Sequence, residues 1–67
     1  QSPAAYLTTW RMKVAARQLL AENRPVAAVA RSVGYTSEFA FNRAFARAHG
    51  VPPGRYRARE RRSEATA

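Results

Sequence analysis

The stretch from Gly34 to Gly50 constrains the fold most, because it has the pattern of a tight turn followed by one short helix. Thr36 and Ser37 suit the start of that helix, since their hydroxyl groups can accept the unpaired backbone N–H groups of the first turn. Gly50 suits its end, because glycine tolerates the left-handed conformation of a helix C-cap. The sequence therefore predicts a helix over about residues 37–49.

This predicted helix has two unlike faces. One face is apolar at helical spacing and consists of Phe41, Ala44, Phe45 and Ala48. The opposite face consists of Phe39, Asn42, Arg43, Ala46 and Arg47. A helix that offers arginines, an amide and an uncovered ring suits contact with nucleic acid. The alternative is an amphipathic helix whose arginine face is only solvated.

The charge balance favours a polyanionic partner. The 67 residues include 12 lysines and arginines, all but one of them arginine, against 4 acidic residues, for a net charge of +8. Phosphates attract such a chain over long range. Arginine also makes planar, two-pronged contacts with phosphate or guanine that lysine cannot make.

Composition narrows the remaining classes. A chain of 67 residues allows one small domain with a marginal core. It has no cysteine, which excludes disulfides and cysteine-ligated zinc. No apolar run approaches the roughly 20 residues that span a bilayer, and the start has no signal-peptide pattern. We expect a soluble, cytoplasmic protein without a membrane partner.

The first helix is predicted to begin at Ser2-Pro3, a hydroxyl cap followed by proline, and to run to about Ala21 or Glu22. Its apolar residues form two stripes, one of Leu7, Trp10 and Val14 and one of Met12, Ala15, Ala16 and Leu19, which Leu20 extends. A surface helix usually needs one stripe. We expect the rest of the chain to cover the second stripe, so that the first lacks a partner and the chain is a fragment of a larger domain. The alternative is that the C-terminal segment covers Trp10, or that Trp10 is exposed.

The middle of the chain has the pattern of two helices around a glycine. Asn23 to Pro25 ends the first helix, and Val26 to Val33 forms a short second one. Gly34 then supplies a turn that needs a positive φ. This order is that of a helix-turn-helix, whose second helix enters the major groove of DNA. A plain helical hairpin would use the same glycine.

The C-terminal part is predicted to be short and partly unstructured. Val51 to Gly54 forms a stiff connector, from which Pro53 opens a short helix as far as Arg57. Tyr56 is expected to dock on the core. Residues 58–67 are expected to form a basic, disordered tail.

These residues resemble the C-terminal part of the AraC/XylS family of bacterial transcription regulators. The resemblance covers residues 2–57 and includes the runs RMKVAARQLL and PVAAVARSVGYTSEFAFNRAFARAHGVPPGRYR. Gln18 departs from the pattern, since many members have an apolar residue there. The resemblance implies an all-α unit like a homeodomain: a long linker helix, the second of two helix-turn-helix units and a short C-terminal helix. It also implies that the first unit and an effector-binding or dimerisation domain belong to the same regulator, and that RNA polymerase is a further partner of an activator.

The resemblance and the helical geometry together give the candidate DNA-contacting residues. By resemblance, Glu38, Phe39, Asn42 and Arg43 match positions that face duplex DNA. Arg43 is expected to contact a guanine edge or a phosphate, Phe39 a thymine methyl group, and Asn42 an adenine edge or a phosphate. Glu38 either accepts from a cytosine amine or favours the helix N-terminus through the dipole. The remaining candidates are phosphate contacts: Arg31, Arg47, Thr36 and Ser37, the last two explained equally by capping.

Other function classes have little support. The single histidine, His49, and the four acids, Glu22, Glu38, Glu60 and Glu64, have no convergent spacing, so we predict no catalytic site, metal site or cofactor. A basic RNA-binding or membrane-binding peptide lacks a stacking platform and a basic amphipathic face, respectively. A protein-interaction module that uses the Trp10 face remains an alternative.

Overall fold

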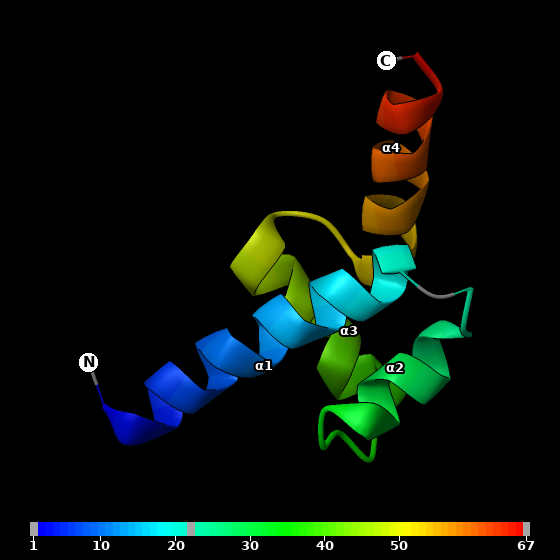
Figure 1. The fold of residues 1–67 in the computed structure, drawn as a ribbon. Helices are drawn as coiled ribbons and strands as arrows, with labels where there is room; N and C mark the ends of the chain where they lie inside the picture. The colour runs from blue at the N-terminus through cyan, green and yellow to red at the C-terminus, as the bar shows by residue number, and fades with distance from the viewer. Residues whose placement is uncertain (1, 22, 67) are drawn as a thin grey trace.

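All the elements of the structure are α-helices. The computed structural model describes residues 2–21 and 23–66, which form four helices: α1 Pro3–Ala21, α2 Val26–Ser32, α3 Glu38–His49 and α4 Pro53–Thr66. α1 crosses α2 and α3, and α4 projects from one end of this group (Figure 1). The predicted all-α fold is confirmed for the described residues.

The start of α1 follows the predicted cap. The Oγ atom of Ser2 accepts a hydrogen bond from the backbone N–H of Ala5 at 3.1 Å, and the helix begins at Pro3. A capping hydroxyl satisfies one of the N–H groups that a helix start leaves without a partner. The helix ends at Ala21, as the sequence predicts.

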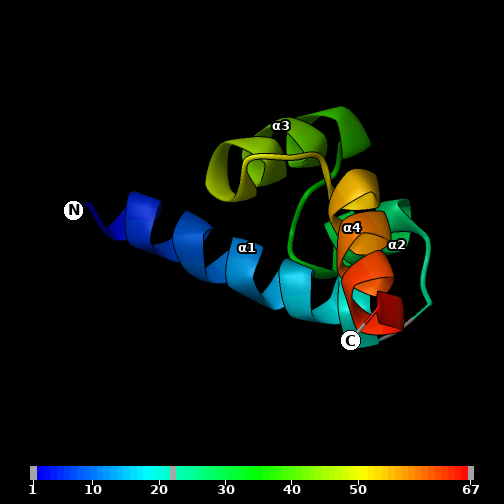
Figure 2. The same ribbon diagram turned by 90° about the horizontal axis from the view of Figure 1, so that it is seen from above.

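The core lies where α1, α2 and α3 meet, and Figure 2 shows α1 beneath α3 with α4 beside them. Its buried residues are Met12, Ala15, Ala16, Leu19, Val29, Ala30, Val33, Phe41 and Phe45. The second apolar stripe of α1 is therefore the covered one, as predicted. Leu20 is an exception, because it is 36% exposed. Ala48, expected on the apolar face of α3, is also exposed.

A row of rings extends the core from α3 to α4. Phe41 meets the ring of Tyr35 edge-on at a centroid distance of 5.6 Å, and Phe45 lies 5.8 Å from Phe41. Phe45 stacks on His49 at 4.2 Å and meets Tyr56 edge-on at 5.3 Å. Tyr56 therefore docks on the core as predicted, and fixes the start of α4 against the end of α3.

α4 is longer than predicted. The sequence predicted a helix that ends near Arg57, with a disordered tail after it, whereas the helix continues to Thr66. The residues after Gly54 include no glycine or proline and are mostly Ala, Arg and Glu, which are strong helix formers. The high charge of these residues predicts disorder. Their helix propensity and the docking of the first turns of α4 on the core favour the helix instead.

Two polar side chains connect α1 to the other helices. Arg57 of α4 donates through Nε to the backbone oxygen of Leu19 at 2.9 Å and through Nη2 to that of Arg24 at 2.6 Å. Gln18 accepts through Oε1 from Arg24 at 3.2 Å and from the Ser32 hydroxyl at 2.8 Å. These bonds tie the end of α1 to α2 and α4, and they give Gln18 a structural role.

No helix among the described residues is long and apolar enough to cross a lipid bilayer.

Candidate nucleic-acid interface

The turn that positions α3 depends on Gly34. Its φ is +93°, a conformation that residues with a Cβ rarely adopt. The N–H of Gly34 donates to the backbone oxygen of Arg31 at 3.1 Å, and that of Tyr35 donates to Ala30 at 2.9 Å. These bonds close the end of α2 and direct the chain into α3, which gives the predicted order of helix, turn and helix.

Both ends of α3 are capped as the sequence predicts. Ser37 is extended, with φ −119° and ψ 123°, and its Oγ accepts from the N–H of Ala40 at 3.2 Å. Gly50 adopts the left-handed conformation, with φ 84°, and its N–H donates to Ala46 at 2.8 Å. Glu38 in the first turn and Arg47 in the last complement the helix dipole.

α3 buries one face and exposes the other. Phe41 and Phe45 are fully buried, whereas Phe39 is 71% exposed. Arg43 and Arg47 are also exposed. Because residues four apart lie on the same side of a helix, the exposed residues form one row along it.

The row contains a contact between a cation and an aromatic ring. The guanidinium carbon of Arg43 lies over the Phe39 ring, 5.7 Å from its centroid. Arg43 also lines a shallow groove of about 280 Å³ with Ala40, Ala44 and Arg47. The exposed face of α3 therefore presents a largely exposed ring, two cations and small side chains between them.

Asn42, another candidate residue, is more buried than Phe39, Arg43 and Arg47. It is half-buried, and its Oδ1 is buried without a hydrogen-bond partner among the described residues. A buried polar oxygen without a partner is costly. This orientation leaves the amide nitrogen as the end that can donate to a ligand.

The predicted phosphate-contacting residues are all exposed. Thr36 and Ser37 lie at the N-terminus of α3, and Arg31 lies in the last turn of α2. The Ser37 oxygen already serves as the cap, so its hydroxyl proton is the group left to donate. Thr36 makes no side-chain hydrogen bond within the described part of the chain. The structure thus brings the residues around the start of α3 together and places Arg31 on the neighbouring helix.

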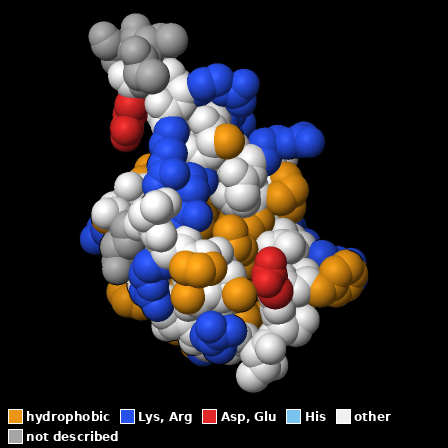
Figure 3. Space-filling view, turned by 90° about the vertical axis from the view of Figure 1, so that its right-hand side faces the viewer, with side chains coloured by type: hydrophobic (Ala, Val, Ile, Leu, Met, Phe, Trp, Pro, Cys, Tyr) orange, Lys and Arg blue, Asp and Glu red, His pale blue; other side chains and the backbone are white. Residues whose placement is uncertain are grey.

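The electrostatic character of the surface is positive. Lys and Arg side chains, blue in Figure 3, are spread over this face from the top to the bottom of the molecule, between apolar and uncharged areas and with few acidic groups. Arg59 forms an ion pair with Glu60 at 3.9 Å. By contrast, Arg31, Arg43 and Arg47 meet no carboxylate within residues 2–21 and 23–66, so their charges are available to an anionic ligand.

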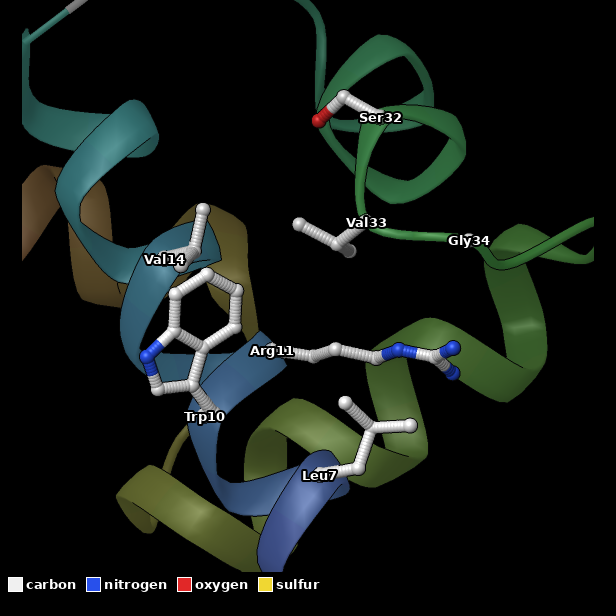
Figure 4. Close-up of a pocket in the computed structure, with 7 residues that line it drawn as sticks. All are labelled: Leu7, Trp10, Arg11, Val14, Ser32, Val33 and Gly34. Atoms are coloured by element: carbon white, nitrogen blue, oxygen red, sulfur yellow. The ribbon is translucent and has the colours of Figure 1, made fainter.

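A second surface feature is an open pocket beside α1. Its volume is about 320 Å³, and it lies between α1 and the turn after α2 (Figure 4). Trp10 and Leu7, 57% and 46% exposed, lie on one side, and Val33 and Gly34 lie on the other. Arg11 extends across the pocket toward Gly34, where its guanidinium carbon comes within 3.5 Å of the position of an added Cβ. Leu7 and Trp10 of the first stripe therefore remain exposed, as predicted, whereas Val14 is half-buried and packs against the core.

Three functional features were not apparent from sequence reasoning. Phe39 and Arg43 are four residues apart, a spacing that places them on one face of a helix. The spacing does not by itself predict that the guanidinium lies over the ring. The other two features join residues far apart in the chain: the turn after α2 lines the Trp10 pocket, and Arg57 bonds to Leu19 of α1. No local pattern encodes such contacts.

Comparisons with known proteins agree with this architecture. A helix-turn-helix domain family matches residues 1–59. A putative AraC-like transcription regulator of Streptomyces lividans is 54% identical over 57 residues, which is 85% of this chain and 19% of the relative. The RCS-specific HTH-type transcriptional activator RclR of Escherichia coli (strain K12) is 47% identical over 60 residues, 90% of this chain and 21% of the relative. The raffinose operon transcriptional regulatory protein RafR of Pediococcus pentosaceus is 39% identical over 56 residues, 84% of this chain and 20% of the relative.

The chain thus spans about a fifth of the length of the curated relatives that it matches. No solved structure matches it significantly.

Proposed function

The chain belongs to the AraC-type helix-turn-helix family of transcription regulators, and on that premise we propose that it reads duplex DNA by placing α3 in the major groove. The observation that carries this proposal is the exposed row on α3. Phe39, Arg43 and Arg47 face outward on a helix whose other face is fixed in the core by Phe41 and Phe45. A rigid support is what positions base-reading side chains reproducibly.

Each outward group suits a different part of the duplex. The Arg43 guanidinium matches the O6 and N7 acceptors of guanine, and Phe39 matches the thymine methyl group. The Asn42 amide nitrogen suits an acceptor on a base edge or a phosphate. Glu38 serves either a cytosine amine or the helix dipole.

Phosphate contacts then supply much of the affinity. Arg31 on α2 and Arg47 on α3 have no carboxylate partner in the described structure, and the hydroxyl groups of Thr36 and Ser37 lie at the N-terminus of α3. Such contacts set the register of a protein on DNA without reading its sequence. They also make binding fall steeply as salt rises, because bound counterions are released.

The pocket beside α1 suits another part of the same regulator. The curated relatives are about five times as long as the matched stretch, and the uncovered side chains of Leu7 and Trp10 are apolar and adjacent. We infer that a further helical unit, the other half of the DNA-binding domain, packs there. We also propose an effector or dimerisation domain in the same regulator, and RNA polymerase as a further partner. The regulator would act in the bacterial cytoplasm.

Selection from randomised duplex DNA at moderate salt, followed by sequencing, tests the proposal. We expect enrichment of a short motif that the Arg43→Ala variant no longer enriches. Parallel binding to single-stranded RNA and to anionic vesicles separates DNA reading from general attraction to anions. Recovery of salt-sensitive binding without any shared motif would contradict base reading by this chain.

A further inference from the structure

Phe39 is unusually placed for a large apolar side chain. At 71% exposure it is the most exposed large hydrophobic residue in the described part of the chain, more so than Tyr6 or Trp10. It lies in the first turn of α3, next to the capped N-terminus, on the face opposite Phe41 and Phe45. It therefore adds nothing to the core, and its ring is available to a ligand of α3.

The ring also orders its neighbour. The Arg43 guanidinium lies over it at 5.7 Å, one helical turn further along the same face. A cation over an aromatic face is attracted by the ring quadrupole. This contact limits the rotamers of a long side chain before it binds, so Phe39 and Arg43 present their groups together.

The two groups have distinct targets in the major groove. Guanine offers two acceptors that a guanidinium contacts with two hydrogen bonds, whereas an apolar ring has only one apolar target there, the C5 methyl group of a pyrimidine. An unmodified G·C pair has no such methyl group. Base pairs stack about 3.4 Å apart, so groups separated by one helical turn and drawn together can reach adjacent pairs.

We propose that Phe39 and Arg43 act as one reading unit that recognises a guanine together with a C5-methylated pyrimidine in the adjoining base pair. The pyrimidine is thymine or 5-methylcytosine, because both present the same methyl group in the major groove. The proposal rests on the proposed function and specifies which chemistry that function reads. It also means that methylation of a cytosine beside a guanine strengthens binding to a sequence that is bound more weakly when unmodified.

Three randomised duplex libraries test this unit. One contains the natural bases, one has deoxyuridine in place of thymidine, and one has 5-methylcytosine in place of cytosine. Uracil keeps every hydrogen-bonding group of thymine and lacks only the methyl. We expect the natural library to enrich guanine beside thymine. The deoxyuridine library is expected to keep the guanine and to show no base preference in the adjoining pair. The 5-methylcytosine library is expected to enrich either 5-methylcytosine or thymine in that adjoining pair.

Measurements on the enriched duplex then isolate the methyl group. Replacing the one thymine with uracil is expected to weaken binding roughly fourfold, the factor expected for one buried methyl-sized group. In Phe39→Ala the thymine and uracil duplexes are expected to bind equally, and the preference for guanine is expected to persist but to weaken, because Arg43 loses the ring that orders it. Phe39→Leu, which keeps an apolar contact, and Tyr6→Ala, which removes an exposed ring on α1, are expected to keep the difference between thymine and uracil.

The outcomes separate this inference from the proposed function. If a motif containing guanine appears but uracil binds as well as thymine, the reading unit is wrong and DNA reading by α3 stands. A difference between thymine and uracil that persists in Phe39→Ala also overturns the role of the ring. If no library gives a motif, the proposed function fails and this inference fails with it. Circular dichroism of each variant checks folding, which an exposed side chain does not determine.

Discussion

Arg43 and Arg59 carry the same charge in different surroundings. Arg43 faces outward on α3, over the Phe39 ring and away from carboxylates of the described residues. Arg59 on α4 lies over the ring of Tyr56 and pairs with Glu60. Comparison of the two therefore separates the effect of position from the effect of charge.

Arg43→Ala is expected to lower binding to the selected DNA motif far more than Arg59→Ala. Loss of a two-pronged guanine contact costs about 1–3 kcal/mol of discrimination. Loss of an arginine outside the interface weakens all DNA equally and slightly. Titration of both variants against the motif and a scrambled duplex measures the effect, and equal losses would argue against α3 as the reading helix.

Some residue roles could be predicted and others could not. Ser37, Gly34 and Gly50 follow from local rules, because a cap or a positive φ depends on a few adjacent residues. The burial of Asn42 could not be predicted in this way. Helical spacing predicts that Asn42 lies beside the exposed face, whereas packing against the core buries its Oδ1. Its proposed contact with DNA stays a prediction.

At the scale of the helices, the end of α3 depends on Gly50. Its φ of 84° disfavours any side chain, although no atom lies within 4 Å of an added Cβ. Gly50→Ala is expected to destabilise the fold by about 1–2 kcal/mol, the cost of the left-handed conformation. Gly54 is the matched control, because it also has open space and lies in α4 without a positive φ.

Gly54→Ala is expected to be neutral or to stabilise by up to about 1 kcal/mol, since alanine reduces the entropy of the unfolded chain. Urea denaturation of both variants measures the difference. Equal effects would mean that the backbone conformation at Gly50 does not determine the cost.

The attachment of α4 to α1 depends on Arg57. Arg57→Ala removes two donors and leaves the partly buried backbone oxygens of Leu19 and Arg24 without them. We expect a loss of about 1–2 kcal/mol, because a buried acceptor without its donor pays a desolvation penalty. Arg55→Ala is the control, since Arg55 is exposed and makes no hydrogen bond with the described residues.

Thermal denaturation of both variants measures this attachment. A melting temperature lowered only in Arg57→Ala agrees with it. If Arg55→Ala lowers the temperature as much, general charge or helix propensity is responsible instead.

At the scale of the whole molecule, the two stripes of α1 have different roles. Leu19 is fully buried in the core, whereas Trp10 is 57% exposed in the pocket. Leu19→Ala is expected to cost about 2–5 kcal/mol, which is most of the stability of so small a domain. Trp10→Ala is expected to change it by about 0.5 kcal/mol or less, as for other surface positions.

Denaturation of both variants as the 67-residue chain measures this contrast. In a longer regulator that contains the chain, Trp10→Ala is expected to become destabilising, because the side chain is then covered. An unchanged effect there would contradict the proposed packing of another unit in the pocket.

Local patterns in the chain specify where the helices begin and in what order they follow, because caps, glycine turns and helical periodicity act over a few residues. The sequence also specifies the basic character of the surface and which stripe of α1 is covered. The contacts between distant segments depend on the packing of the helices: the bond from Arg57 to Leu19 of α1, the bridge at Gln18, and the pocket formed by Trp10 and the turn after α2. The length of α4 also belongs to this group, because docking of its first turns offsets the charge that predicted disorder. Contacts between distant residues depend on how whole helices pack, and no short pattern in the chain specifies that packing.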